Sequence, residues 1–186
     1  MILPIVAFGV PILRKKCSDI SSDFPDFNSI LDNMWETMYE ANGVGLAAPQ
    51  INKGIRLFLI DTTPFLEDED KENEVIVKQV FINARILEES GEEWEFNEGC
   101  LSIPDLREDI TRKSIIRIEY MDENFKIHTK TYDGLTARVI QHEYDHIEGI
   151  LFIDKLSALR KRMIKGKLLD ISKGRVNAAY KMRFSR

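Results

Sequence analysis

The segment 141–146, which reads QHEYDH, has the residue types and the spacing of a catalytic metal site. Its histidines, His142 and His146, are four residues apart, so one helical turn would place both imidazoles on one face, where they could share a divalent metal. Glu143 could act as a general base toward a water molecule that the metal holds. A solvated helix with an accidental pattern is the alternative. Because this pattern alone is typical of zinc peptidases, a zinc endopeptidase is the rival function.

A third ligand distinguishes these possibilities, because catalytic zinc-type sites take three protein ligands and leave one position for water. The position where some zinc peptidases carry a third histidine is Phe152, and no glutamate follows Glu148. Asp170 is the only distant downstream carboxylate, which leaves an opening for an aspartate ligand. The strongest remaining donor is Cys100, whose neighbour Gly99 would let the thiolate approach a metal closely. A Cys/His/His set suits Zn, Fe(II), Co or Ni, whereas a buried structural thiol is the alternative.

A further segment, 43–50, reads GVGLAAPQ. Its glycines and alanines leave room for a bound peptide backbone, and Gln50 could donate its amide N–H to an oxyanion that develops during hydrolysis. Small residues after a helix also form ordinary loops. Leu135 and Val139 continue the face of His142 along the expected helix, which indicates either an apolar pocket beside the metal or ordinary core packing.

Together these segments resemble the signature motifs of the peptide deformylase family: GVGLAAPQ at 43–50, EGCLS at 98–102 and QHEYDH at 141–146. The motifs occur in the family's order, and the resemblance extends over roughly residues 3–156. None of the visible departures belongs to the chemistry. They are a longer acidic loop at 67–72, Ala84 where proline is common, and Ile147 where leucine is usual.

The resemblance implies a hydrolase that removes the formyl group from the N-terminal methionine of new polypeptides and releases formate. By similarity, Cys100, His142 and His146 bind one divalent metal. The family generally uses Fe(II), although Zn, Ni or Co would also suit these ligands. Glu143 would take a proton from water and pass it to the leaving amine. A zinc endopeptidase and a catalytically silent protein that retains the metal remain the alternatives.

The resemblance also implies how the substrate is held. The Gln50 amide and the Leu101 backbone N–H would meet the oxyanion together with the metal, and Gly45 would present its backbone to an extended peptide. The remaining contacts form a methionine pocket with a polar mouth. The pocket residues would be Val44, Phe96, Leu135 and Val139, with Arg107 at the mouth.

Periodicity and composition predict the elements that position these residues. Apolar stripes predict helices at 26–41, 136–148 and 157–169, with Thr136 and Ser157 as N-caps. Runs rich in β-branched and aromatic residues predict strands at 55–61, 75–83, 114–121 and 125–132, with a hairpin turn at 122–124. Since the strands precede the metal helix instead of alternating with helices, we expect an α+β fold. Mixed or antiparallel sheets should pack around a central metal helix within one domain, 1–186, that ends in a C-terminal helix.

Composition is that of an ordinary globular protein, with 44% hydrophobic and 31% charged residues. No apolar run approaches the roughly 20 residues that span a bilayer. The apolar N-terminus is followed, not preceded, by its basic residues 14–16, which does not fit a secretory signal. We therefore expect a cytoplasmic protein with no membrane or DNA partner, and we expect Cys17 to be a structural thiol.

Charge is unevenly distributed along the chain. Residues 157–186 hold ten Lys/Arg and one acid, Asp170, so they carry a formal charge of +9, and the rest of the chain carries −14. Because the family's substrate emerges from a ribosome, this basic helix and tail could dock on ribosomal RNA through phosphate contacts. A solvated helix face with a frayed terminus is the alternative. No proposed catalytic residue lies beyond His146, so removal of 157–186 is expected to spare activity on a short peptide.

Overall fold

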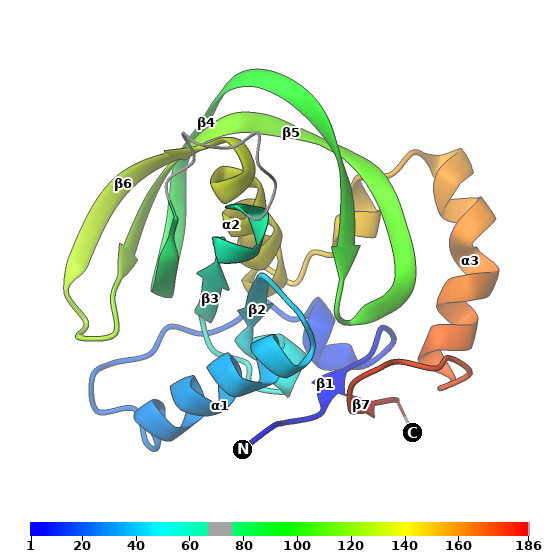
Figure 1. Ribbon diagram of the computed structural model, residues 1–186, viewed down its shortest axis with the longest axis horizontal. Coiled ribbons are helices and arrows are strands. Elements are labelled where there is room, and N and C mark those ends of the chain that lie inside the picture. The colour runs from blue at the N-terminus through cyan, green and yellow to red at the C-terminus, as the bar shows by residue number, and fades with distance from the viewer. Residues whose placement is uncertain (67–75, 186) are drawn as a thin grey trace.

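Within residues 1–66 and 76–185, which the computed structural model describes, the chain forms a five-stranded antiparallel sheet, a two-stranded parallel pair and three α-helices (Figure 1). The acidic segment 67–72 lies outside the described residues. The large sheet has the order β2-β3-β4-β5-β6, with strands Gly45–Ala47, Leu57–Asp61, Lys78–Cys100, Ile103–Met121 and Ile127–Asp133. In the small pair, β1 (Ile5–Val6) lies beside β7 (Met182–Arg183). The predicted α+β class is confirmed.

Strands β4 and β5 are long and arch over helix α2, Gly134–Ile147 (Figure 1). Their pairing register shifts at four places, between residues 82 and 100 of β4. Such β-bulges bend a strand pair and increase its twist, which lets the arch curve instead of lying flat. The arch brings Cys100, the last residue of β4, down beside α2.

Helix α2 is central because one face of it packs on the sheet. Its buried residues Ala137, Ile140 and Ile147 belong to the same core cluster as Phe58 and Phe81 of the sheet. Helix α1 (Phe27–Glu40) buries the predicted stripe that includes Ile30, Met34 and Met38. Helix α3 (Ala158–Ser172) lies to one side of the arch (Figure 1). Across the described residues, every helix is too short or too polar to serve as a membrane span.

The predicted helix ends are partly correct. Ser157 caps α3, since its side chain accepts a hydrogen bond from the Arg160 N–H at 3.2 Å. Thr136 is not the N-cap of α2, because the helix begins two residues earlier and Asp133 occupies the cap position without a side-chain capping bond. Four short 3-10 helices complete the described chain: Pro11–Arg14, Ala48–Ile51, Thr63–Leu66 and Phe152–Lys155.

Two of the four predicted strands were too short. The segment 114–121 is only the second half of β5, and 78–83 is only the first part of β4. The predictions at 55–61 and 125–132 match β3 and β6 within two residues at each end, and the turn between β5 and β6 closes with a hydrogen bond from the Phe125 N–H to the Asp122 carbonyl at 2.9 Å. Strand β2 and the stretch 84–113 were not expected to be strands.

Candidate active site and metal centre

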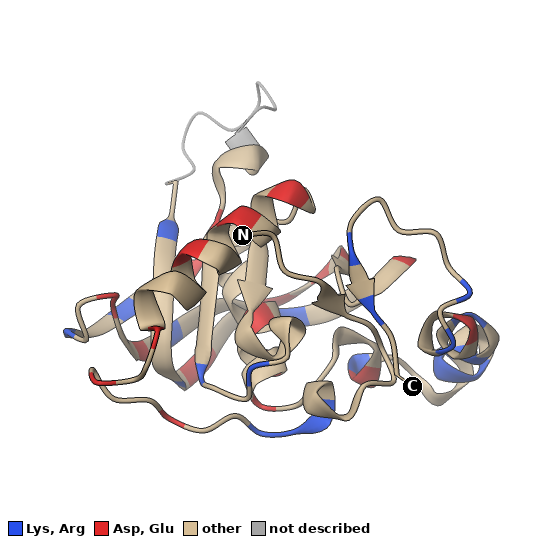
Figure 2. Cartoon of the chain, turned by 90° about the horizontal axis from the view of Figure 1, so that it is seen from below, with Lys and Arg blue, Asp and Glu red and all other residues tan. Residues whose placement is uncertain are grey.

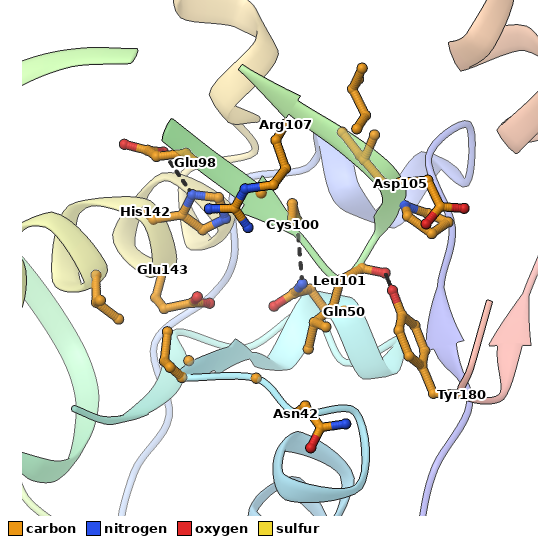
Figure 3. Close-up of a pocket in the computed structure, with 18 of the residues that line it drawn as sticks. Asn42, Gln50, Glu98, Cys100, Leu101, Asp105, Arg107, His142, Glu143 and Tyr180 are labelled. Atoms are coloured by element: carbon orange, nitrogen blue, oxygen red, sulfur yellow. Dashed lines mark hydrogen bonds and ion pairs between the residues drawn. The ribbon is translucent and has the colours of Figure 1, made fainter. Parts of the chain in front are cut away.

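The three predicted metal ligands converge. Cys100 comes from the end of β4, and His142 and His146 come from successive turns of α2. Cys100 and His142 are both drawn at the cavity in Figure 3. One ligand atom from each residue lies within 4.8 Å of the other two, and the Cys100 Sγ is 3.2 Å from the His146 Nε2. A thiolate with two imidazoles is a suitable donor set for a divalent transition metal, so the residues fit the ion that the motif predicts. Asp170 of α3 instead pairs with Arg175, at 2.9 Å.

A buried carboxylate, Glu98, orients the first histidine. Its Oε2 atom is 2.9 Å from the His142 Nδ1, which leaves the Nε2 of that ring for a metal. Arg112 donates to both carboxylate oxygens, at 2.7 and 3.0 Å, and Arg138 donates to one of them at 2.9 Å. Arg112 also donates to Asp145 at 2.7 Å. Although burial alone would raise the pKa of Glu98, the hydrogen bonds from His142 and Arg112 hold it well below its usual range.

Glu143 points its carboxylate into a cavity that His142 and Cys100 also line (Figure 3). The residue is buried, and its Oε2 atom has no hydrogen-bond partner among the described residues. Burial raises the pKa of Glu143 to about 7, while the nearby His142 opposes the rise. Gly45 of β2 makes room for this carboxylate, because a Cβ atom at Gly45 would lie 2.5 Å from the Glu143 Oε1. A carboxylate whose pKa is close to neutral pH has the property that a general base needs.

Gln50 and Leu101 lie beside the Cys100 thiol. The Gln50 Oε1 accepts a hydrogen bond from the Ala47 N–H at 2.8 Å, which turns the amide NH2 toward the metal ligands. The Gln50 Nε2 is then 3.7 Å from the Cys100 Sγ and 3.3 Å from the Ser102 Oγ. Leu101 directly follows the thiol in the turn between β4 and β5. This arrangement places the Gln50 amide next to the predicted metal ligands.

One cavity of about 600 Å³ contains most of the predicted substrate residues. Val44, Gly45, Phe96, Val139 and Arg107 all line it together with Gln50, Leu101 and Glu143. The Arg107 guanidinium is held by Asn97, whose Oδ1 accepts from the Arg107 Nε at 2.8 Å.

Leu135 was predicted to line the methionine pocket, but it is not among the residues that line this cavity. It lines a different depression, beside Lys78 and Thr131. Leu135 does lie on the helix face of His142, as expected. Seven residues of α-helix correspond to about 10 Å along the axis, so Leu135 lies two turns away from His142. Val139, one turn from His142, does line the cavity.

Two features of the site were missed from the sequence. The role of Glu98 was not assigned, although an acid two residues before the metal cysteine is a signal for an orienting carboxylate. Residues 177–180 also line the cavity, and the Tyr180 hydroxyl donates a hydrogen bond to the Leu101 carbonyl at 2.8 Å (Figure 3). No local sequence pattern connects this C-terminal segment with the EGCLS motif.

Comparison with known proteins agrees with this geometry. A family model for polypeptide deformylase matches residues 2–162. A peptide deformylase from Christiangramia forsetii is 60% identical over 189 residues, covering 99% of this chain and 96% of its relative. Another from Flavobacterium johnsoniae is 55% identical, covering 100% and 97%. The crystal structure of peptide deformylase from Thermus thermophilus superposes with a TM-score of 0.81 at 36% identity, covering 94% of this chain and 99% of that one. The chain therefore belongs to the polypeptide deformylase family, a family of metal-dependent hydrolases, and removes the N-formyl group from newly made polypeptides.

Proposed function

We propose that Cys100, His142 and His146 hold one divalent metal ion and that this ion is Fe(II). The convergence of a thiol and two imidazoles from β4 and α2 is the observation that carries the site. These donors suit Fe(II), Zn, Co and Ni alike, so Fe(II) is supported by the family resemblance and not by the donor types. A bound ion would supply Lewis-acid chemistry, acidifying water and withdrawing electrons from the formyl carbonyl.

Glu143 is the proposed proton carrier. Its carboxylate reaches the cavity, and the unpaired Oε2 atom can accept the proton of the attacking water. The same oxygen then returns the proton to the amine that leaves when the formyl C–N bond breaks. A pKa near 7 suits both transfers, because the group must accept and release a proton at the same working pH. Glu143 therefore acts as general base and general acid and is not a metal ligand.

Gln50 and the Leu101 N–H are the proposed oxyanion donors. The Gln50 amide is held by the Ala47 N–H, so its NH2 group is already directed at the reaction centre. A donor that is fixed before reaction costs no reorganisation in the transition state, and the loss of one such donor typically raises the barrier by about 2.7–4 kcal/mol.

The proposed substrate is an N-formyl-Met peptide in extended form. Strand β2, which contains Gly45, is the end strand of the large sheet, so a peptide can add to it through backbone hydrogen bonds. Val44, Phe96 and Val139 offer apolar surface for the methionine side chain, and Arg107 offers a positive charge at the same cavity.

Formate release tests this assignment. Protein loaded with Fe(II) or Ni(II) is incubated with a formyl-Met tripeptide and, as a matched control, with its acetyl-Met counterpart. Formate from the first peptide only, with one metal per chain by elemental analysis, supports the proposal. Internal cleavage of either peptide would instead support an endopeptidase, and a metal-loaded protein that leaves both peptides intact would support a silent binding protein.

We also propose that residues 157–186 contact the ribosome in the cytoplasm, where formylated chains are made. Lys and Arg residues, coloured blue in Figure 2, are concentrated on α3. Some of them pair with the body of the protein: the Arg160 Nε lies 2.5 Å from Glu108, and Lys161 donates to the Asp154 carbonyl at 2.7 Å. The cations that remain exposed and available for phosphate contacts include Arg162, Lys165, Lys173, Lys181 and Arg183.

Deletion of 157–186 is not a clean test of ribosome binding, because residues 177–180 line the cavity. The expectation that such a deletion spares activity is therefore withdrawn. A better test is the triple variant R162E/K165E/K173E, with K53E/K126E/K130E as a control that changes the charge equally. We expect only the first to lose ribosome co-sedimentation, and we expect wild-type binding to fall steeply with salt as counterions are released. Equal binding by both variants would refute the contact.

A further inference from the structure

The C-terminal segment 177–180 reaches the active site from the far end of the chain. Tyr180 is half-buried there, and its hydroxyl donates to the carbonyl oxygen of Leu101 at 2.8 Å (Figure 3). Leu101 lies in the short turn that joins β4 to β5, immediately after the metal-binding Cys100. The hydrogen bond therefore ties the end of the chain to the turn that presents a proposed oxyanion donor.

The phenol is held in place by backbone hydrogen bonds. Strand β7 pairs with β1, and the Ile5 N–H donates to the Lys181 carbonyl at 2.8 Å, one residue beyond Tyr180. Just after β1, the Phe8 N–H donates to the Ser102 carbonyl at 2.8 Å, one residue beyond Leu101. The same N-terminal segment thus anchors both partners of the Tyr180–Leu101 contact.

We propose that Tyr180 is a positioning residue of the deformylase reaction, which fixes the Leu101 turn so that the Leu101 N–H points at the substrate oxygen. This inference rests on the role proposed above for Leu101. A turn at the tip of two long strands can change the tilt of its peptide groups with little effect on the strands. A hydrogen bond to the Leu101 carbonyl removes this freedom from one side, while the strand pairing of Cys100 with Ile103 restrains the turn from the other.

The pKa of the Tyr180 phenol suits a hydrogen-bond donor that stays protonated. Burial raises the pKa of Tyr180 well above its ordinary value, and the negative charges of Cys100 and Asp105 add to the effect. The hydroxyl is therefore protonated at every pH at which the enzyme would work. It donates to a backbone oxygen, so the proposed role is to position and not to transfer a proton.

The substitution Tyr180→Phe tests the inference, with Tyr132→Phe as the matched control. Tyr132 is also half-buried, and its hydroxyl also makes one hydrogen bond, to Tyr120 at 3.1 Å, but it lies outside the cavity. For Tyr180→Phe we expect kcat on a formyl-Met tripeptide to fall about three- to tenfold, the change expected from one lost hydrogen bond, with KM within about twofold of wild type. Tyr132→Phe should keep the wild-type kcat.

Two further measurements make the result decisive. The carbonyl 13C shift of Leu101 should change in Tyr180→Phe and stay unchanged in Tyr132→Phe, which reports the hydrogen bond without relying on turnover. An unchanged shift, or a changed shift with unaltered kcat, would overturn the positioning role. Gln50→Ala separates this failure from a failure of the proposed oxyanion site: if it loses kcat while Tyr180→Phe does not, only the Tyr180 inference is wrong. If neither variant loses kcat, the oxyanion assignment itself is wrong.

Discussion

A single methyl group at Gly45 should disable the enzyme. In Gly45→Ala the new Cβ would lie 2.5 Å from the Glu143 Oε1 and 2.8 Å from the Cδ and Cγ atoms of the same side chain. Optimal carbon contacts are about 3.5–4.0 Å, so the carboxylate would have to move by about 1 Å. A displacement of about 1 Å in a reacting group can cost about 100-fold in rate, and we expect kcat/KM to fall by about this factor.

The assay is designed to separate displacement of Glu143 from damage to the fold. Gly45 does not have a positive φ, so alanine fits its backbone, and the thermal midpoint and metal content should stay close to wild type. Gly54→Ala is the matched control, since its Cβ would meet only the Ile12 Cδ1 at 3.4 Å. Because the methyl group acts through Glu143, adding it to Glu143→Ala should cause little further loss.

Two results would refute this reasoning. If Gly45→Ala keeps kcat/KM within about threefold of wild type, the base either is not Glu143 or tolerates the displacement. If the methyl group causes the same additional loss in the Glu143→Ala background, it acts on another step, and the backbone contact of Gly45 with the peptide becomes the explanation.

The remaining predictions concern single residues of the site and one control cysteine. Glu143→Ala should retain the metal and lose all but a small residual turnover; loss of metal by elemental analysis would show that the carboxylate is a ligand. Cys100→Ala should lose most of its metal, and normal binding would bring Asp170 back as a third ligand. Gln50→Ala should lower kcat about 100- to 1000-fold with little change in peptide affinity; the reverse would assign Gln50 to substrate binding. Burial raises the pKa of Cys17 to about 11, so roughly one thiol in a thousand is ionised at pH 8 and alkylation of the folded protein should be slow until denaturant is added.

The metal helix was predictable because its information is local. Two histidines one turn apart, with an acid between them, define a face of α2 whatever the rest of the chain does. The same local logic found α1 from its apolar stripe and the start of α3 from Ser157. Periodicity gives the direction of a side chain and not the cavity that it lines, and Leu135, on the face of His142, lines a second depression.

The arch of β4 and β5 was only partly predictable. Residues 84–113 are rich in charge, and exposed and buried positions alternate along β4 only in short runs interrupted by four register shifts. A bulged strand loses the period of two on which prediction depends, so its continuity becomes visible only when its partner is known. The approach of Cys100 to His146, 46 residues away, depends on this arch. The sequence offered Cys100 as the strongest remaining donor, and the resemblance supported that choice, but neither predicted the arch.

The contacts that orient the site residues could not be predicted from any local sequence pattern. Glu98 orients His142 only because Arg112 and Arg138 arrive from another strand and from α2 to neutralise it. Tyr180 meets Leu101 only because β7 returns to pair with β1. In both cases the residue type is ordinary and the function comes from long-range placement.

Glu98, Arg112, Arg138 and Asp145 form a buried charge network, and the free energy that its desolvation costs indicates its role. Desolvating ions is expensive, and a well-packed apolar cluster is often as stable as a buried ion pair, so stability alone is a weak reason to keep Glu98, Arg112, Arg138 and Asp145 together. These four residues nevertheless join three elements: Glu98 belongs to β4, Arg112 to β5, and Arg138 and Asp145 to α2. The metal ligands come from the first and last of these elements. Directional hydrogen bonds fix the distance and rotation of α2 relative to β4 in a way that apolar packing does not, so the network serves the geometry of the ligands.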